Sequence, residues 1–557
     1  MTTWWCRISR SVLITLWLSL LVAGAPPAAL GGNVLAVYPH FGFSHFKVVM
    51  PILSELARRG HNLTVISYVK HPQAAEWANY EQLLISQPGE DQSSTTINLV
   101  PLTEHTPTRS LGTLFREYLA LHSEGQKSCE RLYASGHVET VFKRHQTQPY
   151  DLLLTEYFNS DCQLALAKLM NLPIIGLSTC ALMPYYYDRI DLPDTPSFIQ
   201  SEFVGFAGAL SWDERLVNFI QAKVLKLLYR YHSNRADNAL VRRHLGIDMD
   251  VDEVARTQTA FIFGNQHYSL MGSRPQSLQF IEVGGVHLTS QAKQELPTNI
   301  AQFIDQSEVP IIFFSWGSMV RISSIDEDKL AAIVEALERQ PLRVIWKWEA
   351  DEKPQLDADK FLFVKWAPQL ALLCHPRVEL FWAHGGLLGT TESVHCGKPM
   401  LVTPIYGDQF LNAFSVQNRG MGLKLDYQYI SVERVSQALK NLSNTNYATR
   451  SVGISKIFNQ RQNSPLESAV WCVEHVIQHG LLAAEMLQSP GIELKWYVYH
   501  SLDSVCVIIV VLLALAYSLH HFSSGRPSKP YNGNRRRKSK RSVLKANILA
   551  FVIAINI

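Results

Sequence analysis

The chain has 557 residues, which is more than one ordinary hydrophobic core holds, so we expect two domains. Hydrophobic residues make up 47% and charged residues 18%, a balance that suits a globular protein with some membrane-embedded chain. The net charge of +3 comes from the ends: nine of the 51 Lys and Arg residues lie from position 520 onward and two in the first ten residues, which leaves 40 against 48 acidic residues. The mildly acidic body argues against a nucleic-acid partner.

Residues 1–30 have the pattern of a secretory signal peptide. Arg7 and Arg10 precede the apolar run "SVLITLWLSLLVA", and small residues follow in "AGAPPAALGG". The alternative is a signal anchor, in which the same run stays in the membrane. In both cases the residues that follow enter the secretory pathway.

Residues 31–290 are predicted to form a first α/β domain. "NVLAVYP" indicates a buried strand, "KVVMPILSELARRG" a helix that ends at Gly60, and "NLTVISY" a second strand. The pattern returns in "YDLLLTEYFNSDCQLALAKLMNLPIIGLST". Residues 75–145 are polar and favour helices, and residues 181–250 are rich in aromatic and charged side chains suited to one class of substrate. This alternation is typical of a Rossmann-like parallel sheet.

A second α/β series, predicted to span 291–490, follows a polar connector near 287–308. It begins with the strand "VPIIFFSWGSMV" and the helix "DEDKLAAIVEALERQ" and continues to "PMLVTPIYGDQ". The fold class is therefore α/β, with two Rossmann-like domains that face each other. Ligands bind beyond the carboxyl ends of parallel strands, so we expect the site between the two sheets.

Residues 497–519 are predicted to form one transmembrane helix. "VCVIIVVLLALAYSL", extended by the preceding "WYVYH", reaches the ~20 residues that a bilayer requires. The basic residues of 520–557 favour a cytoplasmic tail by the positive-inside rule, and they argue against the alternative of a buried helix. The sequence thus predicts a single-pass type I membrane protein with its body in the lumen or outside the cell.

Sequons at Asn62 and Asn441 agree with this location and predict a glycoprotein. Of the eight Cys residues, one lies in the signal peptide and one in the membrane helix. The other six are scattered, so disulfides are permitted but not required. We interpret Cys396 as a small packing residue rather than a nucleophile.

The stretch 381–410, "FWAHGGLLGTTESVHCGKPMLVTPIYGDQF", has features of a nucleotide site. A strand ends at His384, two glycines follow, and a helix is predicted from near Leu387 to just before Gly397. Glycines let a ligand approach the backbone, and free N–H groups at a helix N-terminus favour a phosphate. No Walker sequence is present, and tight turns use the same residues, so this element alone is a weak signal.

Neighbouring residues make the pattern more specific. Trp366 in "WAPQ" could stack on a base. Glu392 could accept hydrogen bonds from two vicinal hydroxyls, and Asp408 with Gln409 at a strand's carboxyl end could bind sugar hydroxyls. Together these residues describe a nucleotide sugar.

The order W-x-P-Q, H-x-G, E, G-x-P and D-Q, with "FSWGS" (314–318) before it, closely resembles the signature of the UDP-glycosyltransferase family. The whole chain is similar in layout to an animal membrane-bound UDP-glucosyl- or glucuronosyltransferase, and it most resembles an insect member. The resemblance implies a GT-B fold and a UDP-sugar co-substrate. It assigns Trp366 and Gln369 to the uracil and Glu392 to the ribose. It assigns Ser318, His384, Gly386 and Gly389 to the diphosphate, and Asp408 and Gln409 to the donor sugar.

The resemblance also implies a histidine general base in a Ser-His-aromatic context. In "GFSHFKVV" this residue is His45, with His40 as the alternative. The family's partner for the base is an Asp that ends a strand, but "DLLLTEYFNSD" has Glu156 at that place. Asp161 is the alternative partner, although it is also placed to cap the next helix.

No metal and no cofactor are expected. Asp248-x-Asp250 resembles the metal-binding D-x-D of a different glycosyltransferase architecture, but it follows no clear strand, so we interpret it as a solvated acidic turn. The leaving-group charge would be met by a helix dipole and by donors such as His384.

The expected function is the inverting transfer of glucose or glucuronate from a UDP-sugar to a hydroxyl of a small lipophilic acceptor, in keeping with detoxification. Two alternatives remain: a catalytically silent lipophile-binding carrier on the same fold, and a glycolipid-synthesising transferase. Residence in the endoplasmic reticulum membrane and possible homo-oligomers are implied by the resemblance alone.

Overall fold

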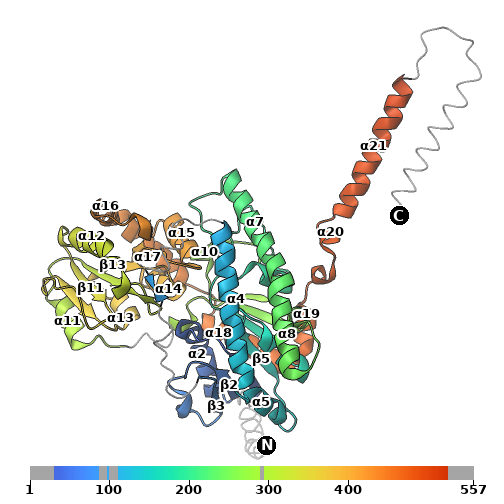
Figure 1. Ribbon diagram of the computed structural model, residues 1–557, viewed down its shortest axis with the longest axis horizontal. Helices are drawn as coiled ribbons and strands as arrows, with labels where there is room; N and C mark the ends of the chain where they lie inside the picture. Colours follow the sequence, from blue (N-terminus) through green and yellow to red (C-terminus); the bar gives the residue numbers. More distant parts are fainter. Residues whose placement is uncertain (1–30, 87–96, 100–110, 289–293, 525–557) are drawn as a thin grey trace, which may run out of the picture. The chain divides into compact units, whose positions relative to one another are not determined.

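A computed structural model describes residues 31–86, 97–99, 111–288 and 294–524 (Figure 1). The predicted signal peptide and the basic tail beyond residue 524 lie outside the described residues. The chain divides into two compact units, one that ends at Ser489 and one that starts at Pro490, and each is described by itself.

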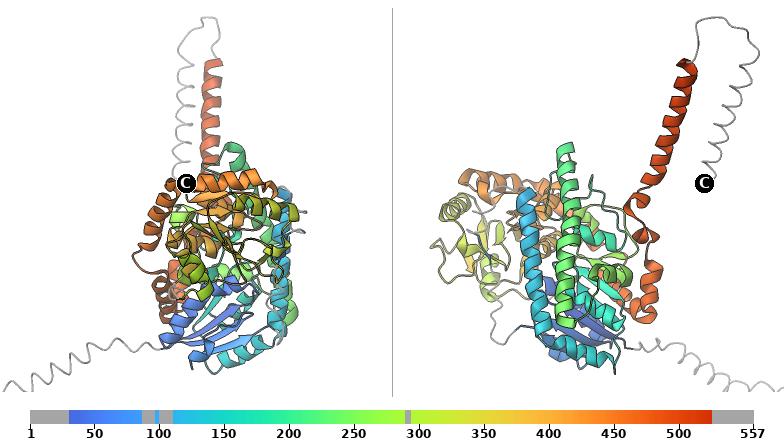
Figure 2. Two further views of the ribbon diagram at one scale, coloured as in Figure 1. Left: turned by 90° about the vertical axis from the view of Figure 1, so that its left-hand side faces the viewer. Right: turned by 45° about the vertical axis from the view of Figure 1, so that its right-hand side comes forward.

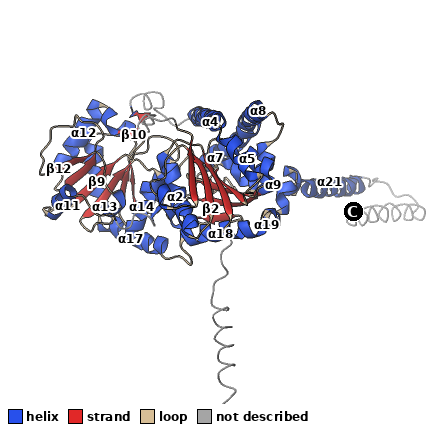
Figure 3. Cartoon of the chain, turned by 90° about the horizontal axis from the view of Figure 1, so that it is seen from below, coloured by secondary structure: helices blue, strands red, loops and turns tan. Residues whose placement is uncertain are grey.

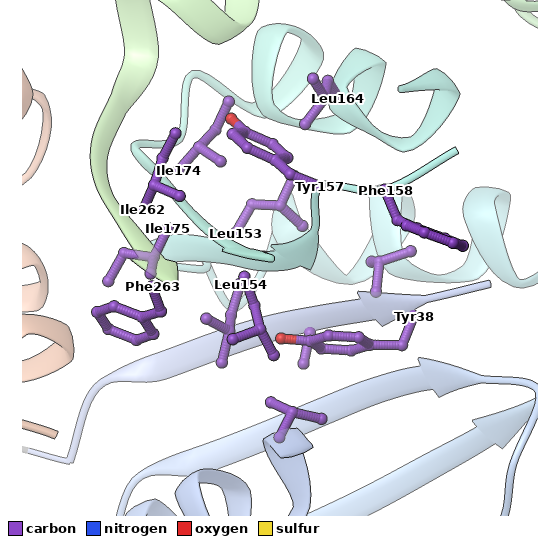
Figure 4. Packing of buried hydrophobic residues seen from close by; sticks show 14 of the residues in the cluster. Tyr38, Leu153, Leu154, Tyr157, Phe158, Leu164, Ile174, Ile175, Ile262 and Phe263 are labelled. Atoms are coloured by element: carbon purple, nitrogen blue, oxygen red, sulfur yellow. The ribbon is translucent and has the colours of Figure 1, made fainter. Parts of the chain in front are cut away.

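The first sheet has seven parallel strands in the order β3-β2-β1-β5-β6-β7-β8. Their bounds are β1 (Asn33–Tyr38), β2 (Asn62–Ser67), β3 (Tyr80–Leu84), β5 (Leu152–Glu156), β6 (Ile174–Ser178), β7 (Thr259–Gly264) and β8 (Phe280–Glu282). The inner strands are nearly continuous apolar runs, as expected for a parallel sheet with helices on both faces (Figure 3). Figure 4 shows part of this core around Tyr38, Leu154 and Phe263. The strand order reverses between β1 and β5, so a ligand site is expected at their carboxyl ends.

The helices of this half include two long ones, α4 and α7, which run side by side along one flank (Figures 1 and 2). The α-helices are α2 (Phe43–Arg58), α4 (Leu111–Ala134), α5 (His137–His145), α6 (Ala165–Met170), α7 (Trp212–Leu228), α8 (Asn234–Leu245), α9 (Val251–Gln258) and α10 (Tyr268–Met271). A π-helical turn, η5 (Tyr229–Ser233), joins α7 to α8, and short 3-10 turns are η1 (Ala74–Glu76), η3 (Cys162–Leu164), η4 (Pro184–Arg189) and η6 (Val286–Leu288).

The second sheet has six parallel strands in the order β12-β11-β9-β13-β14-β15. The strands are β9 (Ile311–Ser315), β11 (Arg343–Lys347), β12 (Phe361–Val364), β13 (Val378–Ala383), β14 (Met400–Val402) and β15 (Gly422–Lys424). Around them lie α11 (Thr298–Asp305), η7 (Ile322–Ser324), α12 (Glu327–Glu338), α13 (Gln369–Leu373), α14 (Leu387–Cys396), α15 (Gln409–Asn418), η8 (Tyr427–Tyr429), α16 (Val432–Leu442) and α17 (Thr445–Asn459). The order reverses between β9 and β13, which places the Gly-Ser turn and the His-Gly-Gly turn at one switch point.

Each of the two sheets packs against segments that belong, by sequence order, to the other half of the chain. α18 (Pro465–His479) and α19 (Leu481–Leu487) fall in the range 291–490 predicted for the second domain, but their apolar side chains join the core of the first sheet. Conversely, β4 (Ile97–Asn98) pairs in parallel with β10 (Val320–Arg321), and Leu99 is buried in a core of the second half. Sequence order alone therefore does not divide the two cores.

The second unit contains η9 (Pro490–Glu493), α20 (Trp496–Tyr499) and α21 (Leu502–Ser524). Residues Leu502–His521 have a mean hydropathy of 2.5, and their length and composition fit a membrane anchor. This stretch starts later than the predicted 497–519, because Ser501 has a φ of 54° and separates α21 from the aromatic turn α20.

Two disulfides are present among the described residues, Cys129–Cys162 and Cys374–Cys396. Cys396 is therefore disulfide-bonded, so its interpretation as only a small packing residue is wrong, whereas it is not a free nucleophile, as interpreted. The second bond joins the end of α13 to the end of α14. Both helices are predicted from the sequence, but their proximity is not. Structural disulfides persist in oxidising compartments, in agreement with a secretory route.

Candidate active site

His45 and Glu156 meet at the carboxyl ends of two neighbouring strands. β1 pairs with β5 in parallel, with Val37 opposite Thr155, so the residues that follow them lie side by side. Helix α2 starts at Phe43, earlier than the sequence indicated, and His45 lies in its first turn. Nδ1 of His45 is 2.6 Å from Oε1 of Glu156, and the two side chains are 13% and 4% exposed. The longer Glu side chain thus reaches the base where the family pattern has Asp.

Thr179 completes this cluster and was missed by sequence reasoning. It follows β6, the next strand of the sheet, and its hydroxyl donates to Oε1 of Glu156 at 2.5 Å. The hydroxyl oxygen of Thr179 also lies 2.7 Å from Nδ1 of His45. Asn265 donates to the backbone carbonyl of Thr179 at 2.9 Å and holds it in place. The only sequence signal was its place at the end of a strand next to β5.

The surroundings of His45 set the charge states of its neighbours His40 and Glu156. The His40 ring is buried, 4.3 Å from the His45 ring, and its Nδ1 accepts the backbone N–H of Gly42. Burial, followed by the nearby His45, lowers the pKa of His40 to about 3, which keeps it neutral. Burial raises the pKa of Glu156, but His45, His40 and Thr179 together outweigh burial and hold this pKa below its usual value. Glu156 is therefore an ionised partner.

His40, His45 and Glu156 each have one possible ligand atom within 4.8 Å of the others, a spacing that could also hold a metal ion. In the structure the short contact between His45 and Glu156 already engages Nδ1 and Oε1. Independence from metal stays a prediction.

Asp161, the alternative partner, does not reach His45. Its buried carboxylate binds Nη2 of Arg189 at 2.5 Å and the hydroxyl of Tyr229 at 2.8 Å. The Arg189 guanidinium is itself buried over the ring of Tyr186, at 4.3 Å. Asp161 occupies the N-cap position of η3, but its side chain makes no capping hydrogen bond. Its role here is to neutralise a buried arginine.

The His-Gly-Gly turn has the predicted geometry, with α14 running from Leu387 to Cys396. The His384 ring lies between two glycines: a Cβ on Gly317 or on Gly386 would be 2.6 Å from it. Burial, and next Lys347, lower the pKa of His384 to about 4, so the ring is neutral. Its Nδ1 is buried and makes no hydrogen bond with the described residues. Ser318 is exposed in the facing turn.

Lys347 is a second residue that sequence reasoning missed. It ends β11, beside β9, and its Nζ donates to the carbonyl of Gly317 at 2.7 Å. Burial lowers its pKa. A lysine, a neutral histidine and the N-terminus of α14 thus converge on one turn, which is suitable for an anion.

Glu392 and Gln369, the residues expected at the ribose and the base, contact each other, and their ligand roles stay predictions. Nε2 of Gln369 donates to Oε2 of the buried Glu392 at 2.6 Å, and a Cβ on Gly389 would lie 3.1 Å from that nitrogen. From the other half, Nζ of Lys47 approaches Oε1 of Glu392 at 3.5 Å. Trp366 is 63% exposed, so it is not a core residue and its ring is open to stacking.

Asp408 and Gln409 lie at the N-terminus of α15, after β14. Oε1 of Gln409 accepts the backbone N–H of Ile405 at 2.8 Å, and Asp408 accepts a hydrogen bond from Asn412 at 2.9 Å. Asn412 also donates to the carbonyl of Gly385, at 2.9 Å. The Asp-Gln pair is thus fixed directly beside the His-Gly-Gly turn.

The remaining predicted positions lie away from this cluster. Asp250 caps α9 through the N–H of Asp252, and Asp248 pairs with Arg242, as expected for an acidic turn. Asn62 and Asn441 are both exposed, which glycosylation requires, and their modification stays a prediction.

Comparison with known proteins decides the family. The model of the family described as "UDP-glucoronosyl and UDP-glucosyl transferase" matches residues 32–524. The chain belongs to the UDP-glycosyltransferase family. The transferase is 28% identical over 515 residues to UDP-glucosyltransferase 2 of Dactylopius coccus, covering 90% of this chain and 96% of that protein. It is 27% identical over 540 residues to UDP-glucuronosyltransferase 1-2 of Rattus norvegicus, covering 94% and 97%.

Solved structures confirm the GT-B fold of the transferase. UGT2 of Phytolacca americana, solved with UDP-2fluoro-glucose and pterostilbene, aligns with a TM-score of 0.54 at 15% identity, covering 80% of this chain and all of that one. A UDP-glucosyltransferase of Polygonum tinctorium aligns with a TM-score of 0.53 at 14% identity, covering 81% and 99%. The family and the fold together identify an enzyme that transfers sugar from a UDP-sugar, which removes the silent carrier as an interpretation.

Proposed function

We propose that this UDP-glycosyltransferase transfers a hexosyl group, glucose or glucuronate, with inversion to a hydroxyl of a small lipophilic acceptor, with His45 as the general base. The contact between His45 and Glu156, 2.6 Å long at the carboxyl ends of β1 and β5, carries the proposal. It engages Nδ1 and directs Nε2 of His45 to the acceptor.

In the transfer step, Nε2 of His45 takes the proton of the acceptor hydroxyl while its oxygen attacks the anomeric carbon. The bond between that carbon and the phosphate oxygen breaks on the opposite face, and UDP leaves with the electron pair. The imidazolium that forms is stabilised by the carboxylate of Glu156, to which Nδ1–H donates. Thr179 keeps Oε1 of Glu156 in position. The proton then passes to solvent, and the product has the opposite anomeric configuration.

The donor would be held by the second half. The diphosphate would bind at the N-terminus of α14 with His384, Ser318 and the Lys347 ammonium. The uracil would stack on Trp366, and Glu392 would accept hydrogen bonds from the ribose. Oε1 of Gln409 accepts the backbone N–H groups of Ile405 and Tyr406, so its amide nitrogen would be the group that donates to the sugar.

Apolar surroundings of the base support a lipophilic acceptor. The ring of Phe158 lies 4.5 Å from that of His45, and Phe41 stacks on His40 at 4.7 Å. The tyrosines of 185–187, in the aromatic segment that the sequence linked to the acceptor, are instead buried.

We further propose residence in the endoplasmic reticulum membrane with a luminal, N-glycosylated body. The apolar helix α21, the exposed sequons and the two disulfides support this location. A glycosidase-sensitive mass shift at Asn62 or Asn441, together with protection of the body from protease in sealed microsomes, would test it. Body fragments cut by protease in intact microsomes would contradict the orientation.

The function is tested with membranes that contain the full-length protein. UDP release from UDP-glucose and UDP-glucuronate is followed with mixed phenols, and the anomeric configuration of the product is read by NMR. We expect a β-glycoside, and for His45→Ala a loss of about 10²–10⁴-fold in kcat. Equal turnover by this variant, or an α-product, would refute the proposed base or mechanism. A hydroxylated long-chain lipid in the panel tests the glycolipid alternative, which requires it to be the preferred acceptor.

A further inference from the structure

We propose that Lys47, a residue of the first half, positions the carboxylate of Glu392 in the second half for the ribose of the donor. The half that contains the base would thereby contribute to the affinity for UDP without touching the nucleotide. The inference rests on the proposed function, because it takes Glu392 as the residue that accepts hydrogen bonds from the ribose hydroxyls.

Helix α2 contacts both parts of the proposed site. His45 lies in its first turn and contacts Glu156 of the first sheet. Lys47 follows two residues later, and its Nζ lies 3.5 Å from Oε1 of Glu392 on α14, the helix next to α2 in Figure 3. Leu388, in the first turn of α14, packs against the hydrophobic core of the first half. The ion pair therefore belongs to a packed contact between the two halves.

Glu392 is a buried carboxylate whose two oxygens are approached from different elements. Its side chain is 1% exposed, and its Oε2 accepts a hydrogen bond from Nε2 of Gln369 at 2.6 Å. Its Oε1 faces Lys47 and also Nε2 of His287, 3.7 Å away. Burial, and next Lys47, lower the pKa of His287 to about 3, so this ring is neutral. The ammonium of Lys47 thus supplies the positive charge that the described residues place beside this carboxylate.

A buried carboxylate requires hydrogen bonds or a counter-ion to compensate for lost hydration. A carboxylate has about four acceptor sites, so each oxygen of Glu392 can accept a ribose hydroxyl while Lys47 and Gln369 stay in place. Removal of Lys47 takes away the counter-ion and one of the groups that fix the orientation of the carboxylate. Both losses weaken the hydrogen bonds that Glu392 offers to the ribose. Lys47 is 27% exposed, so water screens its charge in part and the effect is moderate.

The test compares the binding of UDP with that of 2′,3′-dideoxy-UDP, which lacks both ribose hydroxyls, to the full-length protein. We expect wild type to bind UDP about tenfold or more tightly than the analogue, because only UDP can donate to Glu392. In Lys47→Met the Kd for UDP should rise about fivefold, whereas the Kd for the analogue should change less than about twofold. Lys47→Arg keeps the charge and should retain most of the preference for UDP.

A double replacement checks that Lys47 acts through Glu392. In the Glu392→Gln background, Lys47→Met should change the Kd for UDP less than about twofold, because an amide requires no counter-ion. The matched control is Lys226→Met. Lys226 is a partly buried lysine of the first half that pairs with Asp194 at 2.7 Å, so its replacement should leave the preference for UDP over the analogue unchanged.

Steady-state kinetics separate this role from a general loss of structure. In Lys47→Met the KM for UDP-sugar should rise while kcat stays within about threefold of wild type, since His45 keeps its contact with Glu156. A misfolded site would lower kcat as well. If Lys47→Met does not fold, Lys47→Gln removes the same charge and should show the same loss of preference for UDP.

The outcomes distinguish the inference from the function on which it rests. An equal change in the Kd of both ligands, no change in either, or tighter binding of UDP by Lys47→Met would overturn the role of Lys47. Tighter binding would show that the lysine competes with the ribose for Glu392. Wild-type protein that binds UDP no better than the dideoxy analogue, or does not bind UDP, would instead overturn the proposed donor site.

Discussion

The partner of the base provides the sharpest test of the catalytic site, through the replacement Glu156→Gln. The amide keeps the size of the side chain and can still accept from Nδ1 and Thr179, but it carries no charge. Two charge centres ~4 Å apart at an effective dielectric constant of ~20 interact by about 4 kcal/mol, which gives the scale for stabilisation of the imidazolium. Because 1.36 kcal/mol corresponds to a tenfold change in rate, we expect kcat to fall about 10²–10³-fold.

The assay is single-turnover transfer to a phenol at saturating UDP-sugar, with UDP affinity measured in parallel. Affinity for UDP should change less than threefold, since Glu156 lies in the first half and the residues proposed to bind UDP lie in the second. Glu156→Asp keeps the charge but shortens the side chain, so a smaller loss of about tenfold is expected. Retention of at least a third of the wild-type kcat by Glu156→Gln would refute the assignment of Glu156 as the charged partner of His45.

Two further predictions concern other parts of the structure. In Gly386→Ala, the new Cβ would lie 2.6 Å from the His384 ring, so the KM for UDP-sugar should rise at least tenfold with little change in melting temperature; an unchanged KM would show that His384 does not contact the donor. Asp237 is buried, and burial followed by the charge of Asp161 raises the pKa of its carboxyl to about 8. The unfolded carboxyl ionises near pH 4, so the fold retains a proton that the unfolded chain loses, and stability falls as pH rises from there toward 8. The melting temperature of wild type relative to Asp237→Asn should therefore decrease between pH 5 and pH 8, whereas a constant difference would contradict the raised pKa.

Features encoded in short stretches could be predicted from the sequence. The turn at His384 and helix α14 follow from a strand, two glycines and a helical run that ends at Gly397. The pairing of His45 with Glu156 follows from two strand ends in a parallel sheet, combined with the family resemblance. In each case, local pattern and general sheet geometry place the residue.

Features that depend on which strands become neighbours could not be predicted. Thr179 and Lys347 reach the site because β6 lies beside β5 and β11 beside β9, and neither adjacency is encoded near those residues. The packing of α18 on the first sheet and the Cys374–Cys396 bond are long-range in the same sense. The later start of α21 depends on a single backbone conformation at Ser501.

The two histidines of the site show how surroundings divide their roles. His45 is partly exposed, and its Nδ1 lies 2.6 Å from the carboxylate of Glu156, which orients the ring. His384 is buried beside Lys347, and these surroundings lower its pKa to about 4 and keep it neutral. A neutral imidazole can donate a hydrogen bond to a phosphate oxygen without competing for the acceptor's proton. The proposed mechanism therefore places proton transfer in the half that contains Glu156, and stabilisation of the leaving-group charge in the half that contains the N-terminus of α14.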